Sequence, residues 1–242
     1  IEAEVEVIRQ MGAEFRYGVE VGRDVTLAEL REQGFAAFYV AIGCQGGRLP
    51  GIEGQDASGV WTAVDFLAEY TDQTAGAAAP MGRTVVVGGG NVAIDAARVS
   101  ARTGAPEVTM LCLESAEQMP ASDEEVAEAT EDGVKIECGW GPQEVLTDDA
   151  GAVRGIVFKR CTRVFNDEGR FAPEYDEEDL LTIECDQVVF AIGQSIEWGN
   201  LLEGSAVELG RGQGAVADPQ TYQTAEADIF VGGDVYTGPK FA

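Results

Sequence analysis

The glycine-rich run at 84–98, TVVVGGGNVAIDAAR, constrains the fold of this chain more than any other segment. Its β-branched residues predict a buried strand, and its alanine-rich second half predicts a helix. Between the two stand Gly88, Gly89 and Gly90, with Ala93 completing a G-x-G-x-x-A spacing. The first glycine permits a tight turn, the second lets a pyrophosphate approach the backbone, and the small third residue lets the helix pack on the sheet. The run therefore predicts a dinucleotide-binding loop; the alternative is a purely structural glycine turn.

Two neighbouring features suit the same kind of ligand. The helix that begins at Asn91 and Val92 offers unpaired N–H groups and a partial positive charge to phosphates. Glu114 ends the predicted strand at 107–114, 21 residues after Ala93. A carboxylate in that position can accept hydrogen bonds from the hydroxyls of an adenosine ribose. The alternative for Glu114 is a solvated loop residue.

Helical and strand patterns alternate along much of the chain. Helices are predicted at 1–11, 26–34, 60–70, 91–104 and 122–133, and strands at 14–21, 35–43, 84–87, 107–114, 134–140, 186–194 and 227–233. This alternation predicts a parallel sheet with crossover helices. Two strands around a turn at 148–151, together with a third at 181–186, predict an added β-meander.

Small and polar residues at 71–82 predict a flexible linker and a domain boundary. Three apolar strands then share one ending, because each runs directly into glycine: YVAIG at 39–43, VFAIG at 189–193 and IFVGG at 229–233. A buried strand that ends in this way typically leads into a turn facing a ligand.

The charge of the chain restricts its partners. With 43 acidic and 16 basic residues the formal net charge is −27, which disfavours nucleic acid and anionic membranes. The acidic surface promotes solubility or, alternatively, docks a basic electron-transfer partner. No apolar run reaches the roughly 20 residues of a membrane span, and the amphipathic, acidic start is unlike a signal peptide. We therefore expect a cytoplasmic protein.

The chain contains five cysteines and no histidine. None of the cysteines forms a CxxC or CxxxxC pair, so the sequence predicts buried thiols and neither a metal site nor a redox dithiol. The absence of histidine excludes every catalytic arrangement that depends on it.

The combination of GGGNVAIDAAR at 88–98, EQMPAS at 117–122 and GGDVYTGP at 232–239 resembles the glutamate synthase small subunit and its relatives. These relatives include the flavin and NADPH region of dihydropyrimidine dehydrogenase and electron-bifurcating ferredoxin:NADP oxidoreductases. The resemblance covers essentially the whole chain. It implies an α/β fold with nested, Rossmann-like dinucleotide-binding domains, in which an NAD(P) domain is inserted into an FAD domain. We accordingly expect a partial FAD domain and linker at 1–79, the NAD(P) domain at 80–195, and the return of the FAD domain at 196–242.

The resemblance also implies site residues. For the nicotinamide cofactor these are Gly88, Gly89, Gly90, Asn91, Val92, Ile192 and Gly193, and the strand end discussed above adds Glu114. For FAD they are Ala41, Ile42, Gly43, Gly233 and Asp234, and residues 236–239 would begin the segment that runs under the flavin. Gly233 and Asp234 could alternatively form a plain turn. No catalytic side chain is expected, because hydride transfer to a flavin requires no acid or base from the protein.

Two departures from the family pattern affect the cofactor expectations. The glycine loop of the FAD domain and the cysteines of the family's iron–sulfur domain are not among the 242 residues, so we expect this chain alone to bind FAD weakly. Relatives often carry two arginines at the end of the second NAD(P) strand, where they would hold a 2′-phosphate. Leu113 and Glu114 stand there instead, which favours NAD(H) over NADP(H), although Arg102 on the preceding helix could offer a partner to a phosphate.

The predicted function is an NAD(P)H-dependent oxidoreductase module. It would transfer a hydride between NAD(H) and FAD and pass electrons to iron–sulfur centres or to a partner subunit. A non-catalytic nucleotide-binding scaffold or sensor is the alternative from another class, since a fold alone does not fix function. A disulfide reductase is disfavoured by the lack of a close cysteine pair in the sequence.

Overall fold

The computed structural model describes residues 1–71 and 82–239. The chain divides into two compact units. One unit, called here the sheet unit, comprises Gln45–Ser195. The other, called here the flanking unit, comprises Ile1–Cys44 together with Ile196–Ala242. Most of the linker predicted at 71–82 lies outside the described residues.

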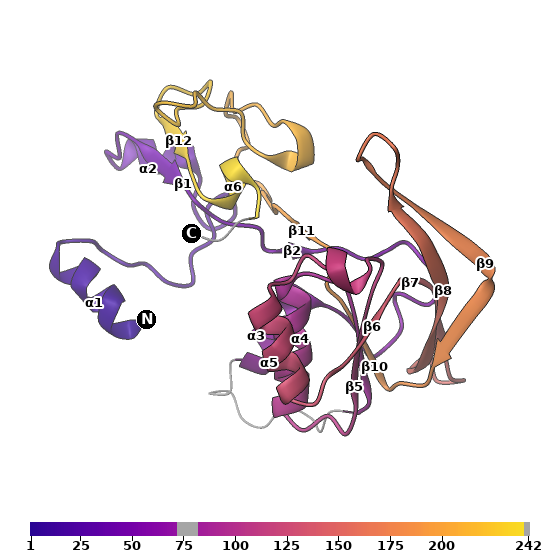
Figure 1. The fold of residues 1–242 in the computed structure, drawn as a ribbon. Coiled ribbons are helices and arrows are strands. Elements are labelled where there is room, and N and C mark those ends of the chain that lie inside the picture. The colour runs from indigo at the N-terminus through magenta and orange to yellow at the C-terminus, as the bar shows by residue number, and fades with distance from the viewer. Residues whose placement is uncertain (72–81, 240–242) are drawn as a thin grey trace. The chain divides into compact units, whose positions relative to one another are not determined.

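A parallel five-stranded sheet forms the centre of the sheet unit (Figure 1). All of its neighbouring strands pair in parallel, as the alternation of strands and helices predicts. In spatial order the strands are β3 (Val60–Thr62), β10 (Gln187–Phe190), β4 (Thr84–Val87), β5 (Val108–Cys112) and β6 (Lys135–Cys138). The strand that leads into the glycine loop is therefore the central one, with β5 and β10 at its two sides.

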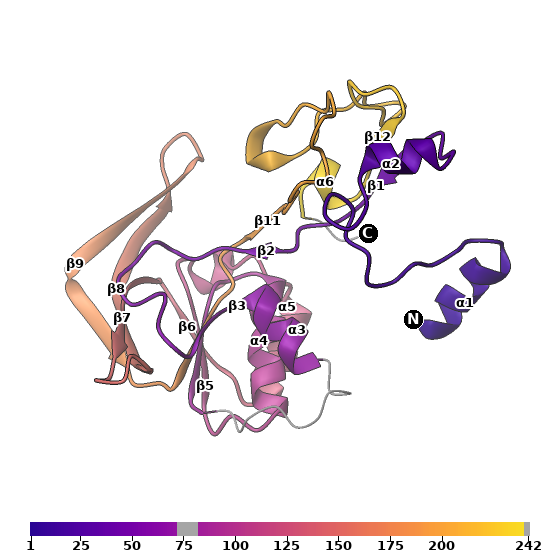
Figure 2. The same ribbon diagram turned by 180° about the vertical axis from the view of Figure 1, so that it is seen from behind.

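Different layers cover the two faces of this sheet (Figures 1 and 2). Helices cover one face: α3 (Ala63–Thr71), α4 (Asn91–Arg102) and α5 (Asp123–Glu131). An antiparallel meander covers the other: β7 (Trp140–Thr147), β8 (Val153–Phe165) and β9 (Phe171–Ile183). Because successive strand residues point to opposite faces, Val86 packs in the helix-side core whereas Val85 and Val87 pack in the meander-side core. Covering on both sides explains the continuous apolar character of β4 and β5.

The sheet unit begins earlier than the sequence predicts. Residues 60–70 were expected to be entirely helical, but Val60–Thr62 form β3, whose residues pair with β10. Thr62 directly precedes α3 and caps its N-terminus, since its hydroxyl accepts a hydrogen bond from the backbone N–H of Asp65 at 3.3 Å. Because β3 joins the sheet and α3 packs beside α4, residues 45–71 belong with the glycine loop. The expected division placed them with the FAD-side residues 1–79.

The N-terminus of α5 carries half of the expected capping box. The Ser122 hydroxyl accepts a hydrogen bond from the backbone N–H of Glu125 at 3.3 Å. The Glu125 side chain does not return the contact, and its Oε2 is buried without a hydrogen-bond partner. Burial, together with the nearby Asp95 carboxylate, raises the pKa of Glu125.

The flanking unit contains a two-stranded parallel sheet and several short helices. Its elements are α1 (Glu2–Gln10), α2 (Leu27–Glu32), β1 (Phe38–Val40), η3 (Arg211–Gln213), β12 (Ile229–Val231) and α6 (Asp234–Thr237). β1 pairs with β12. The Thr26 and Glu29 capping box of α2 is complete. A small core lies around Val40, Ile229 and Val231.

One strand prediction for the flanking unit is wrong, and a second is confirmed only in part. The segment at 14–21 forms no strand, and only Val21 makes an isolated bridge, to Val25; Gly18 adopts a φ of +69°, which is incompatible with an extended run. The apolar run at 35–43 was expected to be buried throughout. It forms only the three-residue β1, and Tyr39 within it is 68% exposed, because β1 has a single neighbouring strand.

Candidate nucleotide-binding site

The glycine loop joins β4 to α4 at the carboxyl edge of the parallel sheet. Gly88 continues the sheet pairing, since its N–H donates to the carbonyl of Leu111 at 2.8 Å. It adopts a φ of +147°, and a Cβ at this position would overlap the backbone carbonyl of Ala191. Gly90 caps α4 in an extended conformation, and no atom lies within 4 Å of where its Cβ would be. The fold thus requires glycine at position 88, whereas Gly90 leaves open space in front of the N-terminus of α4.

By helix geometry the N–H groups of Asn91 and Val92 have no partner within α4. The N–H groups of Ala93 and Ile94, by contrast, both donate to the carbonyl of Gly90, at 2.9 and 3.2 Å. Two backbone donors and the positive end of a twelve-residue helix therefore remain available beside the open space at Gly90. This arrangement fits an anionic pyrophosphate in a chain whose overall charge is strongly negative.

A cavity of about 460 Å³ opens above the loop, within the size range of small-molecule sites. It lies entirely within the sheet unit. The lining residues come from the glycine loop, the ends of β5 and β10, the segment after β5, and the meander: Pro50, Ile52, Val87, Gly88, Gly89, Gly90, Leu111, Cys112, Leu113, Glu114, Pro120, Trp140, Pro142, Phe171, Pro173, Tyr175, Ala191 and Ile192. Among these described residues Glu114 carries the only charge, and none is Lys or Arg.

The backbone of the strand end fixes the position of Glu114. Its carbonyl oxygen accepts a hydrogen bond from the N–H of Gly139 at 2.9 Å and a weak one from the Cys112 thiol at 3.6 Å. Its half-buried side chain reaches back over the glycine loop, because a Cβ on Gly89 would come within 2.9 Å of Glu114 Oε2. Glu114 therefore lies two residues beyond the end of β5, with its carboxylate beside the loop.

The segment after β5, which includes η2 (Ala116–Gln118), is tied to the loop by two hydrogen bonds. The N–H of Ala121 donates to the carbonyl of Gly89 at 3.0 Å. The N–H of Ser122 donates to Asn91 Oδ1 at 3.2 Å. These contacts hold Pro120 against the cavity. They give the Asn91 side chain a structural partner, a role that the sequence did not reveal.

The structure brings together five of the eight residues expected for the nicotinamide cofactor. Gly88, Gly89, Gly90, Glu114 and Ile192 line one cavity. The other three are not among its lining residues. The Val92 side chain packs into the helix-side core, and Gly193 turns away from β10 with a φ of +120°. Asn91 bonds to Ser122.

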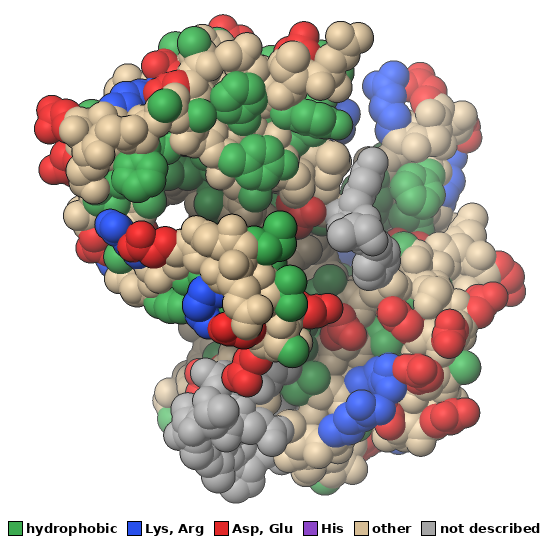
Figure 3. Space-filling view, turned by 90° about the vertical axis from the view of Figure 1, so that its left-hand side faces the viewer, with side chains coloured by type: hydrophobic (Ala, Val, Ile, Leu, Met, Phe, Trp, Pro, Cys, Tyr) green, Lys and Arg blue, Asp and Glu red, His purple; other side chains and the backbone are tan. Residues whose placement is uncertain are grey.

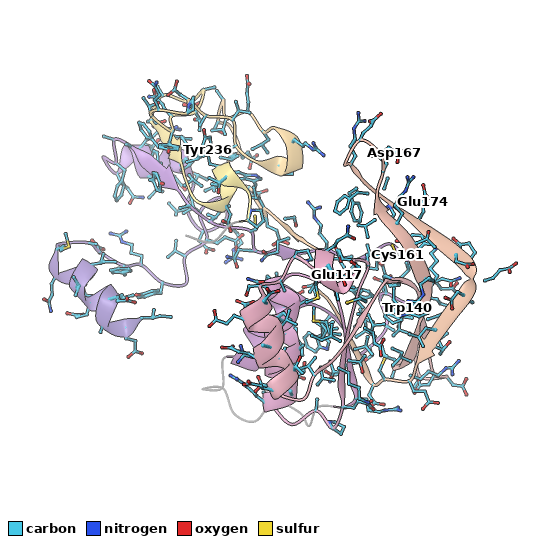
Figure 4. All side chains as sticks on the ribbon, viewed as in Figure 1. Glu117, Trp140, Cys161, Asp167, Glu174 and Tyr236 are labelled. Atoms are coloured by element: carbon cyan, nitrogen blue, oxygen red, sulfur yellow. The ribbon has the colours of Figure 1, made fainter. Side chains whose placement is uncertain are left out.

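Sequence reasoning missed the aromatic wall that the meander contributes. Trp140, Phe171 and Tyr175 line the cavity from β7 and β9 (Trp140 is labelled in Figure 4). The Arg160 guanidinium lies over the Trp140 ring at 3.6 Å from its centroid. Burial raises the pKa of Tyr175. The sequence pattern places Trp140 in the strand at 134–140 and assigns Phe171 and Tyr175 to no element. Which side of the meander meets the cavity also depends on bulges in the strand pairing.

Arg102 does not approach the glycine loop. It belongs to the last turn of α4, roughly 16 Å from Asn91 at 1.5 Å of rise per residue. There its guanidinium pairs with Asp132, with a nitrogen–oxygen distance of 3.0 Å. The concern that Arg102 offers a partner to a phosphate at the loop is thus not supported by the geometry.

The residues expected for FAD lie in the flanking unit, where the ends of two neighbouring strands meet. The N–H of Gly232 donates to the carbonyl of Val40 at 3.1 Å, so the exits of β1 and β12 run side by side. Ala41, Ile42 and Gly43 follow β1, while Gly233 and Asp234 follow β12 at the start of the short α6. Tyr236, labelled in Figure 4, lies within α6. Gly43 and Gly233 both adopt positive φ values, +68° and +63°.

The five cysteines are free thiols. Four are buried as expected, but Cys138 is only partly buried. Contrary to the sequence analysis, two of them approach each other: the sulfur atoms of Cys112 and Cys138 are 3.7 Å apart. Within residues 1–71 and 82–239 no group of three or more acidic, cysteine or histidine side chains is arranged to hold a metal ion.

The acidic side chains of the described residues show no concentration on the face seen in Figure 3 that would indicate a docking surface. On the face seen in Figure 3, acidic side chains are spread among basic and hydrophobic ones and form no single patch. This distribution favours a solvated surface over a dedicated docking face on that side. None of the helices in the described part of the chain has the length and apolarity to cross a membrane.

Comparisons with known proteins agree with this geometry. The family model described as pyridine nucleotide-disulphide oxidoreductase matches residues 2–242. The chain is 37% identical over 203 residues to the NADPH-Fe(3+) oxidoreductase subunit beta of Geobacter sulfurreducens, covering 80% of this chain and 29% of that protein. It is 33% identical over 250 residues to the Escherichia coli glutamate synthase [NADPH] small chain, covering 96% and 52%. The chain thus spans about half or less of the length of these relatives.

Among solved structures the fold resembles Mycobacterium tuberculosis FprA in complex with NADPH. The TM-score is 0.76 at 18% identity, covering all of this chain and 68% of FprA. The fold is thus an α/β, Rossmann-like structure of the kind found in FAD/NAD(P) oxidoreductases. The chain belongs to the pyridine nucleotide-disulphide oxidoreductase family, and within it to the group resembling the small subunit of glutamate synthase.

Proposed function

We propose that the sheet unit binds a pyridine nucleotide in the cavity above Gly88–Gly90. We further propose that the complete protein transfers a hydride between that nucleotide and FAD. The observation that carries the first proposal is the open space at Gly90, which faces two unpaired backbone donors at the N-terminus of α4. The nicotinamide ring and the flavin supply the redox chemistry when bound, and the residues of this chain position them.

In this proposal different residues of the sheet unit bind different parts of the nucleotide. The amides of Asn91 and Val92 receive the pyrophosphate, and the glycines allow its close approach. Glu114 accepts hydrogen bonds from the adenosine ribose hydroxyls. The apolar wall of the cavity, including Trp140 and Tyr175, excludes water and packs against the ligand. Ile192 and Gly193, at the exit of β10, are proposed to lie near the nicotinamide end.

We also propose a preference for NAD(H) over NADP(H). A 2′-phosphate on the ribose would face the Glu114 carboxylate, and no Lys or Arg is found among the described cavity residues to compensate it. The two relatives named above carry NADPH in their names. The proposal therefore makes Glu114 a point at which this chain departs from them.

For the flanking unit we propose that Ala41–Gly43, with Gly233 and Asp234, contact FAD in the complete protein. The side-by-side exits of β1 and β12 support this, since backbone at the carboxyl ends of parallel strands is where such folds place their ligands. Electrons would then pass to an iron–sulfur domain or subunit. That both curated relatives are named as one chain of a larger enzyme is consistent with such a partner.

The test of nucleotide binding is a titration of the 242-residue chain with NADH and with NADPH, followed by the fluorescence of the reduced nicotinamide. We expect saturable binding to the wild-type chain and at least a tenfold weaker affinity for Gly90→Ala, because a methyl group would occupy the approach of the pyrophosphate. Gly210→Ala is the matched control: Gly210 has ordinary extended angles, and its Cβ would make only normal contacts. Absence of binding to a folded wild-type chain, or equal affinity of Gly90→Ala, contradicts the proposal.

A further inference from the structure

Two thiols meet at the carboxyl edge of the sheet although 26 residues separate them in the chain. Cys112 is the last residue of β5 and Cys138 is the last residue of β6. The two strands pair in parallel, with Cys112 directly opposite Cys138. Neighbouring strands lie about 4.8 Å apart, which falls within the Cα separation of about 4.4–6.8 Å that a disulfide requires. The sulfur atoms are already 3.7 Å apart.

We propose that Cys112 and Cys138 are a redox-active pair, which a hydroperoxide converts to an intrachain disulfide joining β5 to β6. The pair lies outside the chemistry proposed above, because hydride transfer uses no thiol. Both side chains point to the same face of the sheet, as directly opposed residues of parallel strands do. Closing the gap to the length of a disulfide, about 2.05 Å, requires side-chain rotation and no change in strand register.

The two thiols differ in their access to solvent, which sets the order of the steps. Cys112 is only 2% exposed, and burial raises its pKa well above the usual range. Cys138 is partly buried and lines a separate hollow together with Cys161 and Arg163. Glu117 also lines this hollow, and both Glu117 and Cys161 are labelled in Figure 4. A small oxidant therefore reaches Cys138 first.

The reaction balances with hydrogen peroxide as the oxidant. The Cys138 sulfur attacks one peroxide oxygen, the O–O bond breaks, and Cys138 becomes a sulfenic acid with release of one water. The Cys112 sulfur then attacks the Cys138 sulfur, the S–O bond breaks, and the departing hydroxide leaves as a second water with the Cys112 proton. Two thiols are oxidised by two electrons, and one peroxide is reduced to two waters.

The proximity of Cys112 also keeps oxidation reversible. A sulfenic acid without a neighbouring thiol is oxidised further to sulfinic acid, which is not recovered by ordinary reductants. With the Cys112 sulfur 3.7 Å away, disulfide formation competes with that second oxidation. A thiol reductant should then restore the original pair.

The experiment exposes the wild-type chain to a slight excess of hydrogen peroxide, blocks the remaining thiols with N-ethylmaleimide, and maps the peptides without reduction. We expect a peptide linking Cys112 to Cys138, a chain mass lower by two hydrogens, three blocked thiols, and full recovery with dithiothreitol. Cys112→Ser should yield no linked peptide and should instead accumulate sulfinic acid at Cys138. Cys185→Ser is the matched control: Cys185 is fully buried and belongs to the meander-side core, and this variant should still form the Cys112–Cys138 link.

A second measurement does not depend on any variant or on the rate of oxidation. Phenylarsine oxide bridges two adjacent thiols, so the reduced wild-type chain should bind one equivalent and lose the two thiols at Cys112 and Cys138 together. Oxidation that stops at Cys138 alone, a linked peptide between other cysteines, or five independently reacting thiols in the folded chain would each overturn the proposal. None of these readouts depends on nucleotide binding, so the result is independent of the function proposed above.

Discussion

The two units of this protein use the same local signal in very different surroundings. In the sheet unit the glycine exits of β4 and β10 leave a five-stranded sheet that is packed on both faces. In the flanking unit the exits of β1 and β12 leave a sheet of two strands, and Tyr39 in β1 is 68% exposed. A strand that runs into glycine therefore indicates where a ligand-facing turn lies, but it says little about how firmly the turn is supported.

Packing supports the glycine turns of the two units to different degrees. A turn at the edge of a large, doubly covered sheet is held by core residues on both sides, so its geometry is fixed before a ligand arrives. The flanking unit has a small core centred on a strand pair, and its turns gain less from packing. We infer that packing holds the turns of the sheet unit more firmly than those of the flanking unit.

The largest expected effect tests whether the two units unfold separately. Phe158 is fully buried in the meander-side core, and Phe158→Ala should lower the stability of the sheet unit by about 3–5 kcal/mol. Differential scanning calorimetry should show two transitions, of which only that of the sheet unit shifts. Phe165→Ala is the control on the same strand, since Phe165 is 44% exposed and should shift neither transition appreciably. A single transition that moves as a whole would mean that the units are energetically coupled.

A second test compares one glycine from each unit. A Cβ on Gly88 would overlap the backbone of Ala191, at a φ of +147° that side chains rarely adopt. Gly88→Ala should therefore destabilise the sheet unit by about 2–3 kcal/mol. A Cβ on Gly232 would instead meet the phenol end of Tyr39, an exposed side chain that can rotate away. Gly232→Ala should cost less than about 1 kcal/mol, and urea unfolding of both variants would measure the difference. Equal costs would remove the contrast between the two turns.

The sequence predicts the sheet unit better than the flanking unit for the same physical reason. The run at 84–98 carries an apolar strand, three glycines and an alanine-rich helix in uninterrupted order, and the structure contains all three. In the flanking unit the alternation at 14–21 had no partner strand to pair with, so no strand formed. Local pattern indicates an element reliably only where tertiary neighbours exist to complete it.

What the sequence could not predict in the site depends on strand register. The position of Glu114 near the loop could be predicted because it follows from the lengths of one strand and one helix. The aromatic wall of Trp140, Phe171 and Tyr175 depends on bulges in the meander, and the Cys112–Cys138 contact depends on the register of β5 against β6. Residues far apart in sequence meet through such register, and a single sequence does not reveal it directly.

The third prediction concerns the charge at the cavity. Two like charges about 4 Å apart interact by about 4 kcal/mol at an effective dielectric near 20, and solvent reduces this to about 1–2 kcal/mol. Wild-type chain should therefore prefer NADH over NADPH roughly 5- to 30-fold. Glu114→Arg should shift the ratio towards NADPH, whereas Glu117→Arg, an exposed position three residues further along, should change it little. Equal or tighter NADPH binding by the wild-type chain would contradict the assignment of Glu114.

The smallest expected effects come from pH, because one partly buried carboxyl group in each unit has a shifted pKa, and the two shifts have opposite signs. The Arg31 guanidinium lowers the pKa of Asp228 in the flanking unit, through a bond of 2.7 Å. Asp228 thus stabilises the fold above its unfolded pKa of about 3.9, and this contribution is lost as pH falls through its lower folded pKa. In the sheet unit, burial raises the pKa of Glu125. Its charged form therefore destabilises the fold above that raised pKa, and the cost disappears below the unfolded pKa of about 4.3.

Two variants test whether the opposite pKa shifts of Asp228 and Glu125 have opposite effects on stability. At neutral pH, Asp228→Asn should be less stable than the wild-type chain, and Glu125→Gln should be more stable. Both differences should shrink as the pH falls. The Glu125→Gln difference should vanish below the unfolded pKa of about 4.3, whereas the Asp228→Asn difference is lost only as the pH falls through the lowered folded pKa of Asp228. Because each variant is compared with the wild-type chain at the same pH, the relief of general repulsion in a chain of charge −27 largely cancels. Urea midpoints measured at a series of pH values should show the two stability differences, of opposite sign, both decreasing as the pH falls. A Glu125→Gln variant that is less stable than the wild-type chain at neutral pH would contradict the expectation. It would show that the Glu125 carboxylate has a partner in solution, such as a bound water, which the glutamine amide does not satisfy.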